Sequence, residues 1–142
     1  MNLKLKVYGL AGILIFISAN THAELLQIDD MNCPDKPNCV SSLVKDSTHY
    51  IEPFTFNDAP EKAMARLKTA LLQEKGITLV TNEAEVLKAE VKSFIFRFID
   101  DVEFSLLTEQ KVIHVRSSSR TGYYDFGVNR RRIERIRQRF QN

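Results

Sequence analysis

The strongest constraint on the fold comes from two neighbouring segments, residues 101–107 and 111–117, in which apolar and polar side chains alternate. A period of two residues is typical of strands that bury one face. Paired as a hairpin, the segments place their apolar side chains on one face and set Glu103 opposite Arg116 on the other. A slip of one residue would mix the two faces, so the alternation itself predicts this register.

Three other segments are candidates for further strands of the sheet. Residues 77–81 are rich in β-branched side chains, and residues 86–93 alternate in the same way as the hairpin. Both patterns are typical of strands. The apolar run at residues 94–99 either prolongs the second of these strands or bends into the next.

Helical spacing replaces alternation in two places. Asp58 precedes Glu61 by three positions, a variant of the capping box, and Gly76 is suited to end the helix that follows. The sequence therefore predicts amphipathic helices at about 59–75 and 128–140. The expected fold class is α+β: an antiparallel β-sheet with both helices packed on one face.

The N-terminus has the pattern of a secretory signal peptide at residues 1–23. Lys4 and Lys6 precede the apolar run Val7–Ala19, and Ala23 ends a stretch of small residues suited to cleavage. An uncleaved anchor is the alternative, but the run would rise only about 20 Å as a helix, against a bilayer core of about 30 Å. The expected location is exported, periplasmic or secreted, with no transmembrane helix after cleavage.

Cys33 and Cys39 are expected to form a disulfide, because an exported protein meets oxidising conditions. Closing so short a ring is worth about 2 kcal/mol by the loop-entropy estimate. A zinc site at these cysteines would need further ligands. Residues 24–57 are predicted to be an irregular arm containing this ring, which forms one domain with an α+β core at residues 58–142.

Three stretches of the chain, CPDKPNCVSS, FIDDVEF and VRSSSRTGYYDFGVNRRRIERI, resemble the domain-of-unknown-function 1499 (DUF1499) family in sequence and order. The resemblance runs from Cys33 to about Phe140. One departure is Tyr123-Tyr124, which is bulkier than the small residues expected between the glycine and the aspartate of the last motif. The resemblance implies an exported or membrane-associated protein and implies no particular reaction.

The segment RSSSRTGYYDFGVN, between the last strand and the last helix, is the candidate site. Helix N-terminal amides, serine hydroxyls and Arg120 can hold a phosphate or a carboxylate. Under a structural interpretation, the segment is a rigid corner in which Arg116 or Arg120 pairs with an acid on the preceding strand, and Asp125 or Asn129 caps the helix. The candidate ligand-binding residues are Asp101, Glu103, Arg116, Ser117, Ser119, Arg120, Asn129 and Arg130.

These residues favour a non-catalytic binding or structural module of the cell envelope. The alternative is a hydrolase or metal-dependent enzyme that uses the same Asp, Glu, Arg and Ser side chains. Ser117 or Ser119 could work with His114 in such an enzyme, but no nucleophile elbow or HExxH motif is present. The sequence assigns no catalytic residue, no metal ligand and no cofactor.

Charge is divided unevenly along the chain. Residues 24–110 carry a net charge of −7 (9 bases minus 16 acids), and residues 111–142 carry +7 (9 minus 2). Arg131, Arg135 and Arg139 fall on one face of the last predicted helix, opposite its apolar stripe. Export argues against nucleic acid as the partner, so an anionic small molecule or an anionic envelope lipid is the expected partner of these arginines.

Overall fold

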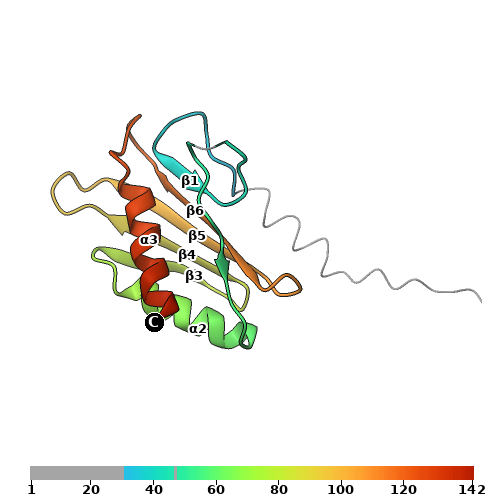
Figure 1. The fold of residues 1–142 in the computed structure, drawn as a ribbon. Coiled ribbons are helices and arrows are strands. Elements are labelled where there is room, and N and C mark those ends of the chain that lie inside the picture. The colour runs from blue at the N-terminus through green and yellow to red at the C-terminus, as the bar shows by residue number, and fades with distance from the viewer. Residues whose placement is uncertain (1–30, 47) are drawn as a thin grey trace, which may run out of the picture.

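The structure is a computed structural model that describes residues 31–46 and 48–142. It has six strands and two helices in this part of the chain (Figure 1). In chain order they are β1 Cys39–Ser41, β2 Phe54–Thr55, α2 Pro60–Leu72, β3 Ile77–Asn82, β4 Val86–Lys92, β5 Ile99–Leu107, β6 Val112–Ser119 and α3 Val128–Gln141. The predicted signal peptide, residues 1–23, lies outside the described residues.

The strands form one sheet in the order β1-β6-β5-β4-β3, and β2 also pairs with β6. All of these strand pairs are antiparallel. Glu103 lies opposite Arg116 and Phe104 opposite Val115, so the predicted hairpin register is confirmed. On the edge strand β3, the register shifts between Leu79 and Thr81, which marks a β-bulge.

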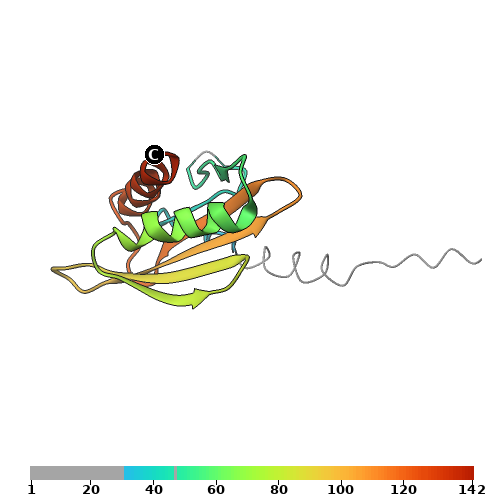
Figure 2. The ribbon, with the colours of Figure 1, turned by 90° about the horizontal axis from the view of Figure 1, so that it is seen from below.

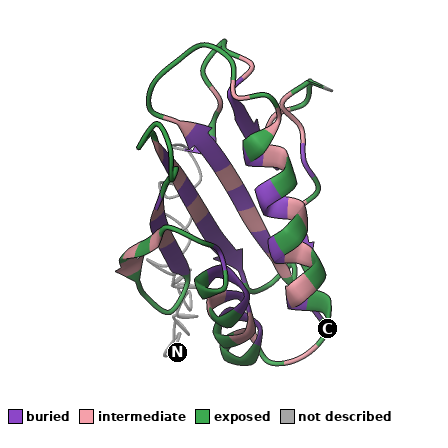
Figure 3. Cartoon of the chain, turned by 90° about the vertical axis from the view of Figure 1, so that its left-hand side faces the viewer, coloured by how far each residue is buried: buried purple, intermediate pink, exposed green. Residues whose placement is uncertain are grey.

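Both helices lie on the same face of the sheet (Figures 1 and 2). Buried and partly buried residues alternate along much of β5 and β6, as expected for strands with one face in the core (Figure 3). The core between sheet and helices includes Leu67, Phe104, Val115 and Ile136. The predicted α+β class is confirmed.

The start of α2 differs from the expected capping box. The N-cap residue is Ala59, which makes no side-chain cap, and Asp58 instead pairs with Arg66 one to two turns into the helix. An arginine two turns away thus outcompetes the nearby backbone amides for this carboxylate. The helix also ends earlier than expected, at Leu72, while Gly76 takes a positive φ of 74° beyond it.

The N-terminal arm packs onto the rest of the protein instead of lying apart from it. Cys33 and Cys39 form the predicted disulfide, with Cα atoms 5.7 Å apart. Val40, Ile51 and Phe54 from the arm belong to the same apolar core as the helices and the sheet. No helix within residues 31–46 and 48–142 is long and apolar enough to cross a membrane.

The apolar run at residues 94–99 bends into the next strand. Residues 93–98 form the loop between β4 and β5, closed by a bond from the Ser93 amide to the Phe98 carbonyl of 2.9 Å. The Phe98 amide donates in turn to the Ser93 hydroxyl, at 2.9 Å. The side chains of this loop stay exposed, which the alternation of the neighbouring strands did not predict.

Candidate functional site

The outer face of the sheet, which points away from the helices, carries two rows of charge. Because side chains alternate along a strand, β4, β5 and β6 present Lys88, Glu103 and Arg116 side by side on this face. Glu103 lies 3.3 Å from Lys88 Nζ and 3.3 Å from Arg116 Nη1. A second row contains Glu90 and Asp101.

Arg116 connects the sheet to the N-terminal arm. Its Nη1 donates to Glu103, and its Nε donates to the Asn32 carbonyl at 2.9 Å. Both Arg116 and Glu103 are mostly covered, with 17% and 15% of the side chains exposed. This agrees with the structural interpretation of Arg116 as a paired residue that fixes a corner.

Arg120 lies at the end of the second row and contacts two carboxylates. It donates to Asp101 at 2.7 and 2.9 Å and also pairs with Glu90. The hydrogen bonds that Arg120 donates, first to Asp101 and then to Glu90, raise the pKa of Arg120 above its usual range. One cation between two anions leaves a net negative charge, so anion binding here stays a prediction that requires Arg120 to leave both partners.

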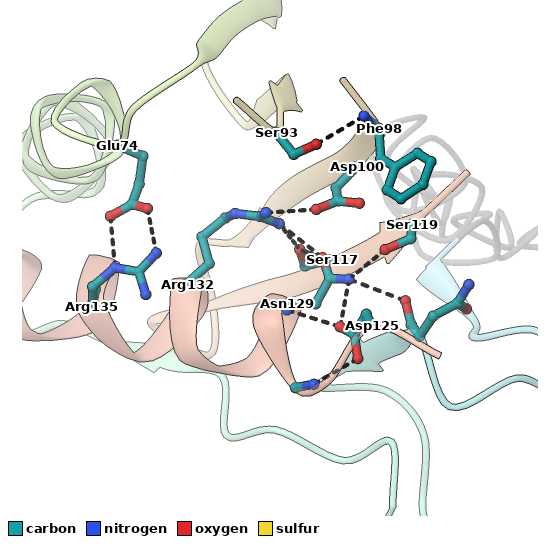
Figure 4. Close-up of polar contacts among 12 residues, drawn as sticks. Glu74, Ser93, Phe98, Asp100, Ser117, Ser119, Asp125, Asn129, Arg132 and Arg135 are labelled. Carbon is teal, nitrogen blue, oxygen red and sulfur yellow. Dashed lines mark hydrogen bonds and ion pairs between the residues drawn. The ribbon is translucent and has the colours of Figure 1, made fainter. Parts of the chain in front are cut away.

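The helix-facing side of the sheet holds a separate buried polar network (Figure 4). Arg132 of α3 donates to Asp100 at 2.6 Å, to Asn129 at 2.9 Å and to Ser117 at 3.3 Å. Ser117 donates to Asn129 Oδ1 at 2.5 Å. The side chains of Arg132 and Asp100 are 6% and 10% exposed, so this is an ion pair inside the core.

Asn129 joins the network to the helix start and to the arm. Its Nδ2 donates to the Asn38 carbonyl at 3.1 Å, to Ser119 at 3.0 Å and to Asp125 at 2.9 Å (Figure 4). Asp125 also accepts bonds from the amides of Gly127 and Asn129, each at 2.9 Å. The N-cap residue of α3 is Gly127, and the carboxylate of Asp125, two positions earlier, already occupies the helix N-terminus where an external anion was predicted to bind.

The predicted site residues thus fall into two groups on opposite faces of the sheet. Asp101, Glu103, Arg116 and Arg120 lie on the outer face, whereas Ser117, Ser119 and Asn129 lie toward α3. Arg130 joins neither group, because its Nη2 donates to the Thr48 carbonyl at 2.9 Å. The structure does not bring these eight side chains together around one ligand position.

The sequence reasoning considered Asp100 only as a partner of Arg116 or Arg120 or as part of an acidic cluster, and it missed Arg132 and Asn38. A signal for the Asp100–Arg132 pair was present. Asp100 lies two positions before the apolar Val102, so both side chains point to the same face of the strand. Arg132 lies one helical turn from Ile136, on the buried side of the helix. A charged residue at an apolar position of each element indicates a buried pair. Asn38 carries no comparable signal in a segment without periodicity.

The predicted arginine face of α3 has an acid from another element. Glu74, beyond the end of α2, accepts a bond from Arg135 at 2.7 Å (Figure 4). It also accepts a bond from Arg139 at 2.5 Å. Burial by itself raises the pKa of Glu74, but the bonds from the two arginines outweigh it and hold the pKa below the ordinary 4.5. Two of the three arginines therefore join the helices together. Arg131 donates to the Phe126 carbonyl at 2.8 Å.

His114 contacts a serine other than those considered from sequence. Its Nδ1 lies 3.0 Å from the hydroxyl of Ser42, which also accepts the Val115 amide at 2.9 Å. Burial lowers the pKa of His114 below its ordinary 6.5, so the ring is neutral at pH 7. Within the part of the chain that the structure describes, no three His, Cys, Asp or Glu side chains are grouped to hold a metal ion.

Exposed aromatic side chains gather at the end of the sheet where β4 and β6 finish. Two loops, residues 93–98 and 120–127, lie at this end in both views (Figures 1 and 2). We call their exposed apolar side chains the aromatic end: Phe94, Ile95, Phe96, Phe98, Tyr123, Tyr124 and Phe126. Phe94 is 98% exposed and Phe126 is 76% exposed. Soluble domains rarely expose a large contiguous apolar patch without a binding role.

Comparison with known proteins gives one match. Residues 31–140 match the family described as "Protein of unknown function (DUF1499)". Searches of curated proteins and of solved structures returned no match. The matched residues span both helices almost completely and all six strands, and they include the disulfide, the buried network and the aromatic end. The chain therefore belongs to the DUF1499 family.

Proposed function

We propose that the protein is an exported, non-catalytic binding module of the cell envelope, and that it binds its partner through the aromatic end. The observation that carries the proposal is the exposure of seven apolar side chains in two loops at one end of the fold. Placing such side chains in water is unfavourable, and a partner that covers them recovers the hydrophobic free energy.

The polar side chains are already paired with other groups of the same chain, and this supports the proposal. Arg116, Arg120 and Arg132 each pair with carboxylates of the same chain. Buried networks of this kind rigidify a fold, and the network around Asn129 anchors the loop that carries Tyr124 and Phe126. The polar residues therefore hold the binding loops in position, and the aromatic side chains make the contact.

Export is supported by the signal-like N-terminus and by the Cys33–Cys39 disulfide, since disulfides persist in oxidising compartments. The test is expression of the full chain in a bacterium, followed by cell fractionation and N-terminal sequencing. We expect the protein in the periplasmic or envelope fraction, beginning near Glu24 and with no thiol free to alkylate. Recovery in the cytoplasm with two reactive thiols would overturn the proposal.

The contact between Ser42 and His114 favours a hydrolase as the second candidate function. In a hydrolase, a neutral imidazole takes the proton from a serine hydroxyl as the serine attacks. Ser42 is only 8% exposed, and its oxygen already accepts a backbone amide, which fits a structural role better. Labelling by a fluorophosphonate that Ser42→Ala abolishes would favour the hydrolase; no labelling of the parent would favour the binding module.

A further inference from the structure

We propose that the partner of the aromatic end is an anionic lipid bilayer, which the two loops enter to the depth of the headgroups. This inference rests on the proposed function, because it names the partner of the same surface. Its first support is geometry: Figures 1 and 2 both show the two loops projecting from the same end of the sheet. A flat surface can therefore contact both loops at once.

The aromatic side chains are arranged as protruding tips. Phe94 is almost fully exposed, and Phe96 stacks on Phe98 with ring centroids 5.6 Å apart. Tyr124 and Phe126 make an edge-to-face pair at 5.1 Å in the other loop. Phenylalanine rings suit the acyl boundary, while tyrosine rings have an apolar body and a polar hydroxyl suited to the headgroup level.

Both loops hold a residue in the left-handed backbone region that favours glycine. Arg97 has φ 55° in the first loop and Phe126 has φ 55° in the second. Such conformations are costly for bulky residues and cluster at binding sites. In each loop, the tight turn at this position presents side chains to solvent instead of folding them onto the sheet.

The charge around the aromatic end is complementary to anionic lipid. Lys92 and Arg97 border the first loop, and the Lys92 amide bonds to the Gly76 carbonyl, which brings Lys75 to the same end. Among the residues the structure describes, Lys75, Lys92 and Arg97 make no ion pair. Basic residues beside a membrane are each attracted by anionic headgroups.

Most of the nearby acids have partners within the protein. Asp100 pairs with Arg132, Asp101 and Glu90 share Arg120, and the carboxylate of Asp125 accepts the first amides of α3. In the disulfide ring, Asp35 adjoins Lys36. The three unpaired cations Lys75, Lys92 and Arg97 exceed the net negative charge that Arg120 leaves with Asp101 and Glu90, which favours an anionic surface such as phosphate-bearing lipids over a basic or neutral apolar groove.

The depth of insertion follows from the backbone. Ser93 and Phe98 close the base of the first loop with two hydrogen bonds, and the Arg120 amide donates to the Ile99 carbonyl at the base of the second. The tips between these closures have few internal backbone bonds, and unpaired amides cannot enter the hydrocarbon core. The loops consequently stop at the interface, where water and headgroups supply the missing partners.

A tryptophan scan tests the proposal directly, because the chain contains no tryptophan. Phe96→Trp places a single fluorophore in the aromatic end, and Val80→Trp places one at an exposed apolar position on the edge strand β3, 61% exposed. With vesicles of phosphatidylglycerol and phosphatidylcholine, we expect a blue shift and quenching by brominated lipid for Phe96→Trp only. Equal responses of the two variants, or no response, would overturn the proposal.

Vesicle co-sedimentation separates the contributions of apolar side chains and charge. Phe94→Ser with Phe96→Ser should weaken binding by about tenfold or more, and the control Val80→Ser should not. Arg97→Gln with Lys92→Gln should remove the preference for phosphatidylglycerol over pure phosphatidylcholine, whereas Lys62→Gln on α2 should keep it. All variants carry the same N-terminus as the parent, so their differences report the loops alone.

Two outcomes separate the lipid inference from the proposed function. If the parent fails to sediment with either vesicle, but a photoreactive residue in place of Phe96 crosslinks to an envelope protein, the partner is a protein and the lipid inference is wrong. In that case the binding module stands. If the exported parent binds neither vesicles nor an envelope protein through this end, both proposals are wrong.

Discussion

Replacing Arg132 by alanine should cost more stability than any other single change to an arginine of this protein. The substitution removes the donor of three hydrogen bonds, to Asp100, Asn129 and Ser117. It leaves the Asp100 carboxylate in a position where 10% of its side chain reaches solvent. The alanine does not fill the space of the guanidinium, and the carboxylate has no other cation nearby in the network.

The magnitude follows from the cost of an unpaired buried charge. Breaking a buried ion pair by removing one partner costs about 3–5 kcal/mol. For a domain of this size, a loss of that order lowers Tm by roughly 10–20 °C. A protein with a typical stability of about 5–15 kcal/mol would lose a large part of its margin.

Urea unfolding, followed by circular dichroism at constant pH with the disulfide intact, measures the loss. Arg120→Ala is the matched control, because Arg120 also forms ion pairs, with Asp101 and Glu90, but sits at the surface, where ion pairs contribute little. The double variant Asp100→Asn, Arg132→Met removes both charges and should recover part of the stability lost in Arg132→Ala. A midpoint for Arg132→Ala equal to that of Arg120→Ala would refute the reasoning.

Three further predictions use the same unfolding assay. Arg116→Ala should destabilise the protein more than Arg120→Ala, because it removes one of two cations from the largely covered Glu103 together with the bond to the Asn32 carbonyl; equal midpoints would contradict this. The free energy of unfolding should fall as the pH drops below about 6.5, because burial lowers the pKa of His114 in the folded state and the unfolded chain binds the proton more readily. His114→Gln should remove this part of the dependence of stability on pH, and an unchanged dependence would contradict the prediction. Reducing the disulfide of Cys39 should cost about 2 kcal/mol, and no change of midpoint on reduction would show that the ring is not stabilising.

The hairpin was predictable because one-face burial leaves a single register compatible with the apolar pattern. Glu103 could be paired with Arg116 from sequence for the same reason. The N-cap of α2 was not predictable, because the capping box considers only the nearby backbone amides as partners of Asp58, whereas Arg66 reaches Asp58 from two turns away. Local rules therefore held where burial reinforced them and failed where a tertiary partner was available.

The candidate site shows the same division. The sequence singled out the right segment, but it placed the residues of two sheet faces in one pocket. Strand alternation separates Arg116 from Ser117, and only the crossing of α3 over the sheet brings Arg132 to Asp100. The pairing of Glu74 with Arg135 likewise depends on how the two helices pack against each other. The periodicity within one helix carries no information about that packing.

The docking of the arm against β6 has a consequence for the order of folding. β1 pairs with β6 across most of the described chain, and the Arg116 bond to the Asn32 carbonyl spans 84 residues. Contacts of such long separation carry a high loop-closure cost and tend to form late, whereas the β5–β6 hairpin and the six-residue cysteine spacing are local. We therefore expect the ring to close and the hairpin to pair independently, and the arm to join the sheet only after residues 112–119 have paired with β5.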